Sequence, residues 1–401
     1  MYECMILCYL NLKKLFMNSN KNITIVGAGP GGLTAAISLA KNGYDVNLFE
    51  QNNDVGLRFN GDFQGLENWS DEEDTLKVLS RIGIKINFLC HPYSGSDGLF
   101  YGPKLQKIQV KTSRSLFYLV ERGSNGNSLD QGLRRQAEDA GVNILWGRKL
   151  DSVDSQAAIV GTGPKAADAI AKGMVFKTSL KNQFIGFINN KIAPKAYAYL
   201  LVNNGKATFA TCMFEDFKNE KLYYDRALRV LNSVIDIDIV EPKEFGGFVN
   251  FFNEPKISKD NRILYVGENA GFQDALWGFG IKYAMLSGYY AARSIIERNN
   301  YDELCKAYLY PKLQTSLANR WLFAHLYNKG YSYLLKKMEA LDDVIPALRK
   351  HYNTSFSKRL IYPIAQRWYK TRLIDKQCMH EHCDCVWCRH GKLAHASSDI
   401  G

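Results

Sequence analysis

Three glycines and an acid near the start of the chain have the spacing of a dinucleotide-binding site. Residues 27–32 read GAGPGG, and Glu50 lies 18 residues after Gly32. Gly27 permits a tight turn, Gly29 lets the backbone approach a pyrophosphate, and Gly32 lets a helix pack closely on a strand. The helix N-terminus attracts phosphate, and Glu50 can accept hydrogen bonds from a ribose. We therefore expect a bound dinucleotide.

The residues around these glycines predict the elements that such a site needs. The β-branched run 23–26 predicts a buried strand, residues 33–41 predict a helix, and residues 45–49 predict a second strand that ends on Glu50. The alternative is a glycine-rich turn in another kind of α/β protein. The strand before the glycines and the acid after them favour dinucleotide binding.

Composition limits the class of protein. The chain has 401 residues, 46% of them hydrophobic, which is typical of a globular protein with room for two domains. The net charge of +11 favours phosphate-bearing ligands or an anionic membrane surface. No nucleic-acid motif is present, so we expect no nucleic-acid partner. No apolar run is long enough for a transmembrane helix, and the scattered cysteines outside the C-terminus predict a reducing cytoplasm.

Residues 1–20 form an N-terminal extension whose apolar part precedes its lysines and lacks a small-residue cleavage site, unlike a secretory signal. The alternatives are a membrane-touching segment, a disordered extension, and translation from an upstream start with Met17 as the usual beginning. We favour the last two.

The middle of the chain predicts a second sheet. Residues 196–202 and 207–214 alternate in polarity around Asn203-Asn204-Gly205-Lys206, and Asn-Gly is a strong hairpin signal. Residues 107–111 and 116–120 predict further strands of a second sheet. The buried run 262–266 predicts a late strand of the nucleotide-binding domain, which makes that domain discontinuous.

Helices are predicted from their caps and periodicity. Ser70 and Glu73 predict a capping box for a helix over 71–83, after a loop over 52–69. Ser128 predicts the start and Gly141 the end of a helix over 128–140. The other predicted helices cover residues 223–234, 281–298 and much of 301–351.

Two later motifs complete a resemblance. Residues 267–271 read GENAG after the predicted late strand, and residues 277–280 read WGFG before a long helix. Together with the first glycines, they resemble the FAD-dependent oxidoreductases of the p-hydroxybenzoate hydroxylase superfamily, most closely the geranylgeranyl reductase family, over about residues 21–320. In that family an aspartate at the position of Glu268 ordinarily hydrogen-bonds the ribityl chain of FAD. The residues that the resemblance and the fingerprint assign to FAD are Gly27, Gly29, Gly32, Glu50, Arg58, Gly267, Glu268, Gly278 and Gly280.

The resemblance implies an α/β fold: a Rossmann-like, glutathione-reductase-type FAD domain that is discontinuous, an inserted antiparallel-sheet substrate domain and a helical C-terminal region. The expected limits are 1–20 for the extension, 21–90, 121–180 and 255–300 for the FAD domain, 91–120 and 181–254 for the substrate domain, 301–376 for the helical region and 377–401 for a Cys/His-rich tail.

The chain departs from the family pattern at several places. Asn60 replaces a family cysteine in the glycine loop, and the family's lipid-pocket run has only a partial counterpart at residues 197–201. Arg122 and Asp130 resemble a family Arg-x-x-Phe-Asp segment without its phenylalanine. Arg58 is expected to stack on the flavin or bind phosphate, or else to be a solvated loop residue. The candidates for an apolar substrate pocket, with core packing as their alternative, are Tyr197, Tyr199, Phe248, Phe251 and Trp277.

The implied function is that of an FAD-dependent oxidoreductase in which the flavin itself does the chemistry. The expected reaction reduces carbon–carbon double bonds of a small apolar substrate, with isoprenoid lipids as one candidate class and NAD(P)H as one candidate electron donor. One alternative is an NAD(P)H-dependent flavin monooxygenase, although the hydroxylase Asp-Gly motif is absent near residues 161–163. The other is a non-enzymatic flavin- and metal-binding protein that senses redox state or docks a partner.

The C-terminal tail concentrates metal-ligating residue types. Thiolates and imidazoles at such spacing suit zinc or an iron–sulfur cluster, and a cluster would pass electrons to the flavin or to a redox partner protein. A reduced tail without metal is the alternative. The candidate ligands, of which a subset would bind, are Cys378, Cys383, Cys385, Cys388, His380, His382 and His390.

A basic segment precedes this tail. Leu360, Ile364 and Trp368 share one helical face, and Arg359, Arg367, Lys370 and Arg372 surround them. Such a helix can lie on an anionic membrane, which would make the protein cytoplasmic and peripheral at the membrane. A helix docked on the protein core is the alternative.

Overall fold

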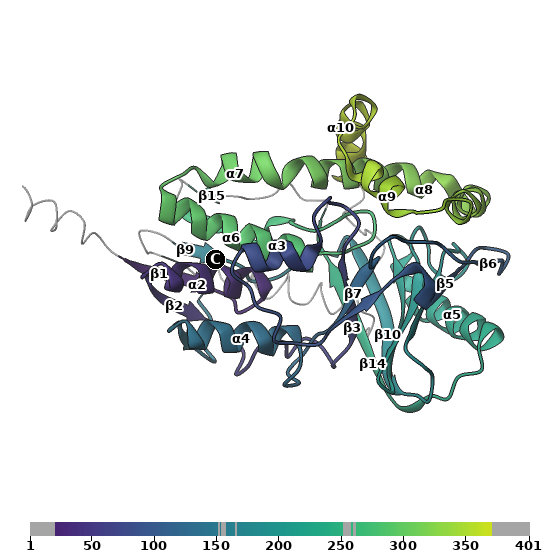
Figure 1. Cartoon of the computed structure of the whole chain (residues 1–401), viewed down its shortest axis with the longest axis horizontal. Helices are drawn as coiled ribbons and strands as arrows, with labels where there is room; N and C mark the ends of the chain where they lie inside the picture. The colour runs from purple at the N-terminus through teal and green to yellow at the C-terminus, as the bar shows by residue number, and fades with distance from the viewer. Residues whose placement is uncertain are drawn as a thin grey trace, which may run out of the picture.

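The computed structural model describes residues 21–150, 153, 158–164, 167–251, 258–259 and 262–370. The predictions for residues 1–20 and for the Cys/His-rich tail lie outside these residues. Figure 1 shows a sheet with its helices at one end of the molecule, a second sheet region at the other, and helices α8, α9 and α10 above the second region.

The first region is a six-stranded sheet. The strand predicted to precede the glycine-rich turn lies near its centre. Strand β1 pairs in parallel with β2 and β9, and the late strand β16 pairs in parallel with β9. The late strand therefore returns to the first sheet, and this sheet is discontinuous in sequence, as predicted. The strands, in spatial order, are β15 (Ser258–Lys259), β16 (Ile263–Tyr265), β9 (Ala158–Val160), β1 (Asn22–Val26), β2 (Asp45–Phe49) and β8 (Asn143–Leu145).

Four helices accompany this sheet: α2 (Pro30–Lys41), α4 (Leu129–Asp139), α6 (Ile281–Glu297) and α7 (Tyr301–Tyr308). Helix α2 packs against both α4 and α6. The contact with α6 is close because glycines meet there: a Cβ on Gly288 would lie 2.0 Å from the carbonyl oxygen of Gly31. Ser128 caps α4, as predicted, by accepting a hydrogen bond from the Gln131 N–H at 3.1 Å.

The second region is built on a seven-stranded sheet. The predicted hairpin is confirmed, and all pairs are antiparallel except β11 with β5. Helix α5 (Glu220–Val234) shares a hydrophobic core with this sheet. Strand β10, which lies in the range expected for the FAD domain, belongs to this sheet. The strands, in spatial order, are β14 (Val240–Val249), β10 (Ala169–Lys177), β13 (Lys206–Met213), β12 (Ala198–Asn203), β11 (Gln183–Phe187), β5 (Gly98–Tyr101) and β6 (Lys107–Ile108).

A three-stranded sheet lies between the two regions and corrects two predictions. Its order is β3 (Phe63–Glu67), β7 (Phe117–Glu121) and β4 (Cys90–Tyr93). The stretch 52–69, predicted as a loop, therefore contains a strand. The strands predicted at 107–111 and 116–120 belong to different sheets, because alternation indicates which face is buried but not which strand is the neighbour.

The capping prediction at Ser70 was wrong. Helix α3 (Thr75–Arg81) begins later, and Asp74 caps it by accepting from the Leu76 N–H at 2.9 Å. The Ser70 hydroxyl instead donates to Glu67 at 2.7 Å and receives a hydrogen bond from Lys282 at 2.9 Å. A contact with neighbouring Glu67 and one with Lys282, 212 residues away, thus replaced the predicted cap.

The C-terminal helices are α8 (Tyr310–Glu339), α9 (Ile345–Tyr352) and α10 (Phe356–Lys370). Helices α8 and α9 share a hydrophobic core with the three-stranded sheet, and α10 packs on α8. Helix α8 is kinked at Tyr327, where φ is 51°. Short 3-10 turns occur at η1 (Gly95–Asp97), η2 (Phe217–Asn219) and η3 (Gly267–Ala270). In the described part of the chain, no helix combines the length and the apolarity that crossing a bilayer requires.

Candidate cofactor and substrate cavity

One cavity of about 1010 Å³ connects the six-stranded sheet with the other two sheets. Sites for a single small molecule usually occupy about 300–1,000 Å³, so this cavity lies at the upper end of that range. Charged side chains line the end near the first glycines, and aromatic and aliphatic side chains line the other end. The two ends therefore suit ligands of different chemistry.

The glycines form a cradle at the polar end. Gly27 has φ of 97°, and a Cβ there would lie 2.4 Å from the Gly161 carbonyl oxygen. A Cβ on Gly32 would lie 2.0 Å from the Gly27 carbonyl oxygen, so helix α2 reaches the strand only because position 32 has no side chain. Gly29 and Gly27 line the cavity, and no side chain caps the N-terminus of α2. This open N-terminus can bind a phosphate.

Glu50 connects the end of β2 to this cradle. One carboxylate oxygen accepts from the Ala28 N–H at 2.8 Å, and the other accepts from the Asn52 backbone N–H at 2.9 Å and its side-chain amide at 2.7 Å. Glu50 is buried and lines the cavity. The residue therefore holds the glycine turn in addition to the ribose role that its position predicts.

Replacing Glu50 tests this double role. Glutamine has one acceptor oxygen and cannot serve both the Ala28 and the Asn52 donors. Because a hydrogen bond to a charged group contributes about 1.5–3 kcal/mol, we expect Glu50→Gln to weaken FAD binding roughly tenfold to a hundredfold. The measurement is quenching of flavin fluorescence on titration of the apoprotein. Asp45→Asn, at the exposed start of the same strand, is the control, and equal affinities in all three proteins would contradict the assignment.

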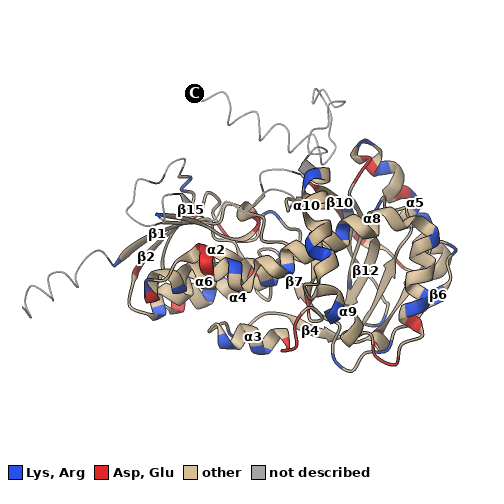
Figure 2. Cartoon of the chain, turned by 90° about the horizontal axis from the view of Figure 1, so that it is seen from above, with Lys and Arg blue, Asp and Glu red and all other residues tan. Residues whose placement is uncertain are grey.

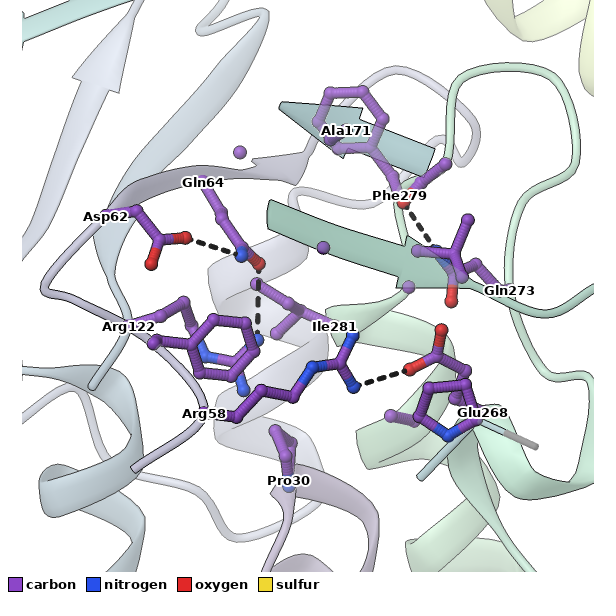
Figure 3. Close-up of a pocket in the computed structure, with 18 of the residues that line it drawn as sticks. Pro30, Arg58, Asp62, Gln64, Arg122, Ala171, Glu268, Gln273, Phe279 and Ile281 are labelled. Carbon is purple, nitrogen blue, oxygen red and sulfur yellow. Dashed lines mark hydrogen bonds and ion pairs between the residues drawn. The ribbon is translucent and has the colours of Figure 1, made fainter. Parts of the chain in front are cut away.

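Arg58 and Glu268 meet across the cavity. Figure 3 shows the pair, whose Nη1 and Oε2 atoms lie 3.4 Å apart. Arg58 also donates to the Phe248 carbonyl oxygen at 2.8 Å. Burial raises the pKa of the Glu268 carboxyl, and Arg58 and the Asn250 N–H oppose that rise. Arg58 is thus an ion-pair partner of the residue that the resemblance assigned to the ribityl chain, and its side chain, in a turn, remains 42% exposed.

A second charged network lies beside this pair. Arg122 donates to both carboxylate oxygens of Asp130 at 2.9 Å and to Gln64 at 3.2 Å, and Gln64 donates to Asp62 at 2.9 Å. Burial, the largest effect, would lower the pKa of Arg122, but the carboxylates of Asp130, Asp62 and Glu268 together raise it. Burial raises the pKa of Asp62 despite its contacts with Gln64 and Arg122. The resemblance placed Asp62 in the glycine loop over residues 58–62 without giving it a role, and no motif indicated Gln64.

The WGFG turn is held by Asp274. Its carboxylate accepts from the Trp277 N–H at 2.8 Å and the Tyr352 hydroxyl at 3.1 Å. Burial, the largest effect, raises the pKa of Asp274 to about 6. Gly278 and Gly280 line the cavity, as does Gly267 near Glu268. Asp274 therefore positions the turn that the resemblance places beside the flavin.

Four of the five predicted pocket aromatics line the cavity: three lie at its apolar end, and Phe248 lies beside Arg58 at the charged end. Tyr197, Tyr199, Phe248 and Trp277 line the cavity, and the Tyr197 hydroxyl donates to the Trp277 carbonyl oxygen at 2.5 Å. Phe251 does not line it; its ring packs in a core with residues of α8 and α10. Cys212, which the sequence did not indicate, also lines the cavity, and burial raises the pKa of its thiol to about 12. That thiol is therefore protonated at neutral pH.

No group of His, Cys, Asp and Glu side chains that could hold a metal ion occurs among the residues that the structure describes. The predicted zinc or iron–sulfur ligands, residues 378–390, lie outside them.

Comparisons with known proteins agree with this fold. Residues 25–63 match the NAD(P)-binding Rossmann-like domain. The chain is 23% identical to digeranylgeranylglycerophospholipid reductase 2 of Methanosphaera stadtmanae, with 82% of this chain and 91% of that protein covered. It is 28% identical to thiamine thiazole synthase of Pyrococcus horikoshii over 109 residues, which span only 43% of that protein.

Solved structures show the same fold. A geranylgeranyl bacteriochlorophyll reductase-like protein from Thermoplasma acidophilum aligns with a TM-score of 0.63 at 18% identity, covering 88% of this chain and 99% of that one. The flavin-dependent brominase Bmp2 aligns with a TM-score of 0.59 at 12% identity, covering 87% and 99%. These similarities confirm the resemblance to FAD-dependent oxidoreductases of the geranylgeranyl-reductase-like type.

The described residues fit FAD at the polar end. The cradle excludes side chains where a pyrophosphate would lie, α2 presents an open N-terminus, and Glu50 lies at the ribose position. Arg58, Gly267 and Glu268 continue the lining toward the WGFG turn. Gly27, Gly29 and Glu50 would hold the adenosine diphosphate half, and Glu268 and the Gly278–Gly280 turn would hold the flavin half.

Proposed function

We propose that this FAD-dependent oxidoreductase reduces carbon–carbon double bonds of an apolar, isoprenoid-type lipid. The observation that carries the proposal is the apolar end of the cavity. Bound FAD in its reduced form would supply a hydride. The chain would bind FAD at the charged end and the hydrocarbon at the other. The reductase named among its relatives acts, by that name, on a digeranylgeranyl glycerophospholipid, and this gives the substrate class to test first.

The lining of the apolar end supports a hydrocarbon chain. Its side chains come from the seven-stranded sheet, the three-stranded sheet and helices α8 and α9, and none of them is charged. An alkyl chain can be buried there without stripping water from an ion. The residues that form this end are Phe100, Val110, Leu116, Phe117, Phe184, Ile188, Tyr197, Tyr199, Leu201, Trp277, Leu334, Leu335, Met338, Val344 and Leu348.

The protonation states of the buried groups fit reduction better than covalent catalysis. Burial raises the pKa of Tyr197 and Tyr199 well above the usual value and that of Cys212 to about 12. The apolar end therefore presents hydroxyl and thiol groups and no thiolate. Reduction of an alkene adds a hydride to one carbon and a proton to the other. Because the Tyr197 and Tyr199 hydroxyls and the Cys212 thiol stay protonated, none of them is an anion that could attack the substrate.

The test is a single turnover without oxygen. The protein is loaded with FAD, reduced with dithionite and freed of excess reductant. Digeranylgeranyl glycerophospholipid in neutral detergent is then added. We expect the flavin absorbance to return and the product to gain two hydrogen atoms per reduced double bond. The fully saturated lipid with the same headgroup is the control. Reoxidation only with oxygen, with an oxygenated product, would indicate a monooxygenase; no reoxidation by any lipid would favour a redox-sensing role.

Narrowing the apolar end gives a second prediction. Met338 and Leu334 lie one turn apart on α8 and both line the cavity. We expect Met338→Trp to raise KM for the lipid at least about tenfold, a factor equal to roughly 1.4 kcal/mol, because the larger ring occupies substrate space. FAD content should not change. Met338→Leu conserves volume and should behave as the wild type. An unchanged KM in the tryptophan variant would place the substrate elsewhere.

A further inference from the structure

Helix α10 carries a largely exposed apolar stripe. Phe356, Leu360, Ile364 and Trp368 recur every four residues, which places them on one face. Their exposed fractions are 79%, 59%, 54% and 37%. The opposite face is used for packing, since Ala365 and Tyr369 are buried with residues of α8. Among the described residues, the Trp368 ring lies 5.6 Å from the His325 ring of α8, whereas Phe356, Leu360 and Ile364 are more than half exposed, and an apolar patch of this kind marks an interaction site.

The charge around the stripe limits what can cover it. Residues 344–370 contain six Lys or Arg and no Asp or Glu. Arg359 and Arg367 are exposed on α10 itself, and α9 adds Lys350 and Arg349 in its last turn, of which Arg349 is paired with Glu72 at 3.6 Å. Figure 2 shows basic residues on α8, α9 and α10, and Figure 1 shows α10 rising from the body of the molecule. The occupant must therefore be apolar and anionic.

Two other occupants fit these charges poorly. A second copy of the chain would bring two cationic faces together, which Coulomb repulsion opposes. The C-terminal residues 371–401 contain four Lys or Arg and four Asp or Glu, so they offer no net negative charge to α10. An anionic lipid surface supplies both properties at once, because acyl chains lie directly beneath phosphate groups.

We propose that α10 docks the protein on an anionic membrane. The stripe enters the boundary between headgroups and acyl chains, and Arg359 and Arg367 contact lipid phosphates. Helix α8, on which α10 packs, also lines the apolar end of the cavity. Docking therefore brings that wall of the cavity close to a lipid store. The docking itself is independent of the reaction, and its test uses no activity.

The experiment is co-sedimentation of the full chain with vesicles. We expect binding to vesicles of phosphatidylcholine and phosphatidylglycerol, weaker binding at high salt because exposed charges are screened, and little binding to pure phosphatidylcholine. Leu360→Ser with Ile364→Ser should weaken binding at least about tenfold, and Arg359→Gln should weaken it only on anionic vesicles. Ile86→Ser with Leu222→Ser removes two side chains exposed by 40% and 42% on other elements and should change nothing.

Several results would overturn the docking proposal. These are no binding to either vesicle, equal losses in the control variant, or binding that the α10 changes do not affect. A concentration-dependent dimer that Leu360→Ser with Ile364→Ser dissolves would assign the stripe to a second copy instead. If a chain ended at residue 370 binds vesicles and the full chain does not, the C-terminal tail would be the occupant of the stripe. Because all five replaced residues are exposed, thermal melting should be unchanged, which would exclude misfolding as the cause.

Discussion

Asp130→Asn is expected to lower the free energy of unfolding by roughly 3–5 kcal/mol, the usual cost of breaking a buried ion pair. The Arg122 and Asp130 side chains are only 9% and 2% exposed, and both guanidinium contacts with the carboxylate measure 2.9 Å. The same carboxylate accepts from the Gly123 N–H at 2.9 Å. Asparagine keeps the shape but removes the charge and turns an N–H group toward the guanidinium. The cation then remains buried without its counter-ion.

Urea unfolding measures this effect, and a control lies on the same helix. Asp139 is exposed near the end of α4, so Asp139→Asn should change stability by no more than about 0.5 kcal/mol. Arg122→Met combined with Asp130→Leu should cost less than the sum of the two single changes, because neither charge is left alone. If Asp130→Asn costs less than about 1 kcal/mol, the pair is not the buried support that the structure indicates.

Asp274→Asn is expected to change how stability depends on pH. The folded-state pKa of Asp274 is raised from 3.8 to about 6 by burial. In the window between these values the folded protein binds more protons than the unfolded chain. The contribution of Asp274 to stability is therefore fully present below about pH 4 and lost as the pH rises through about 6. The difference corresponds to roughly 3 kcal/mol, and asparagine, which does not ionise, removes it.

The measurement compares urea unfolding of the two proteins at about pH 4 and about pH 8. Relative to the wild type, the variant should gain about 3 kcal/mol between these values. Asparagine can still accept from the Trp277 N–H, so the turn should persist. Asp236→Asn, at an exposed position, should show no such gain. A constant difference between wild type and Asp274→Asn across the window would mean that the Asp274 carboxyl is not destabilised in the folded protein.

The sequence by itself determined the cofactor cradle. Positions 27 and 32 must be glycine because a side chain there would collide with neighbouring backbone. Glu50 follows at the end of the next strand, so the spacing of these residues alone predicts the site. The same holds for the hairpin at Asn204-Gly205 and for the Ser128 cap, where donor and acceptor lie within a few residues. The hairpin, the Ser128 cap and the contact of Gly32 with Gly27 are encoded locally, whereas the Gly161 oxygen that faces Gly27 comes from a distant part of the chain; the structure places each feature where the pattern predicted.

Only the tertiary structure decided which distant side chains meet. Arg58 and Glu268 are 210 residues apart, and Tyr197 and Trp277 are 80 apart. Alternation indicates which face of a strand is buried but not which sheet receives it, so β7 was assigned to the wrong sheet. Phe251, a candidate for the cavity, packs instead in a core with residues of α8 and α10. Ser70 lost its predicted capping role because Glu67 and Lys282 bind its hydroxyl. Each of these contacts depends on how distant segments of the chain pack together. The residues next to each partner in the sequence do not indicate which partner it will meet.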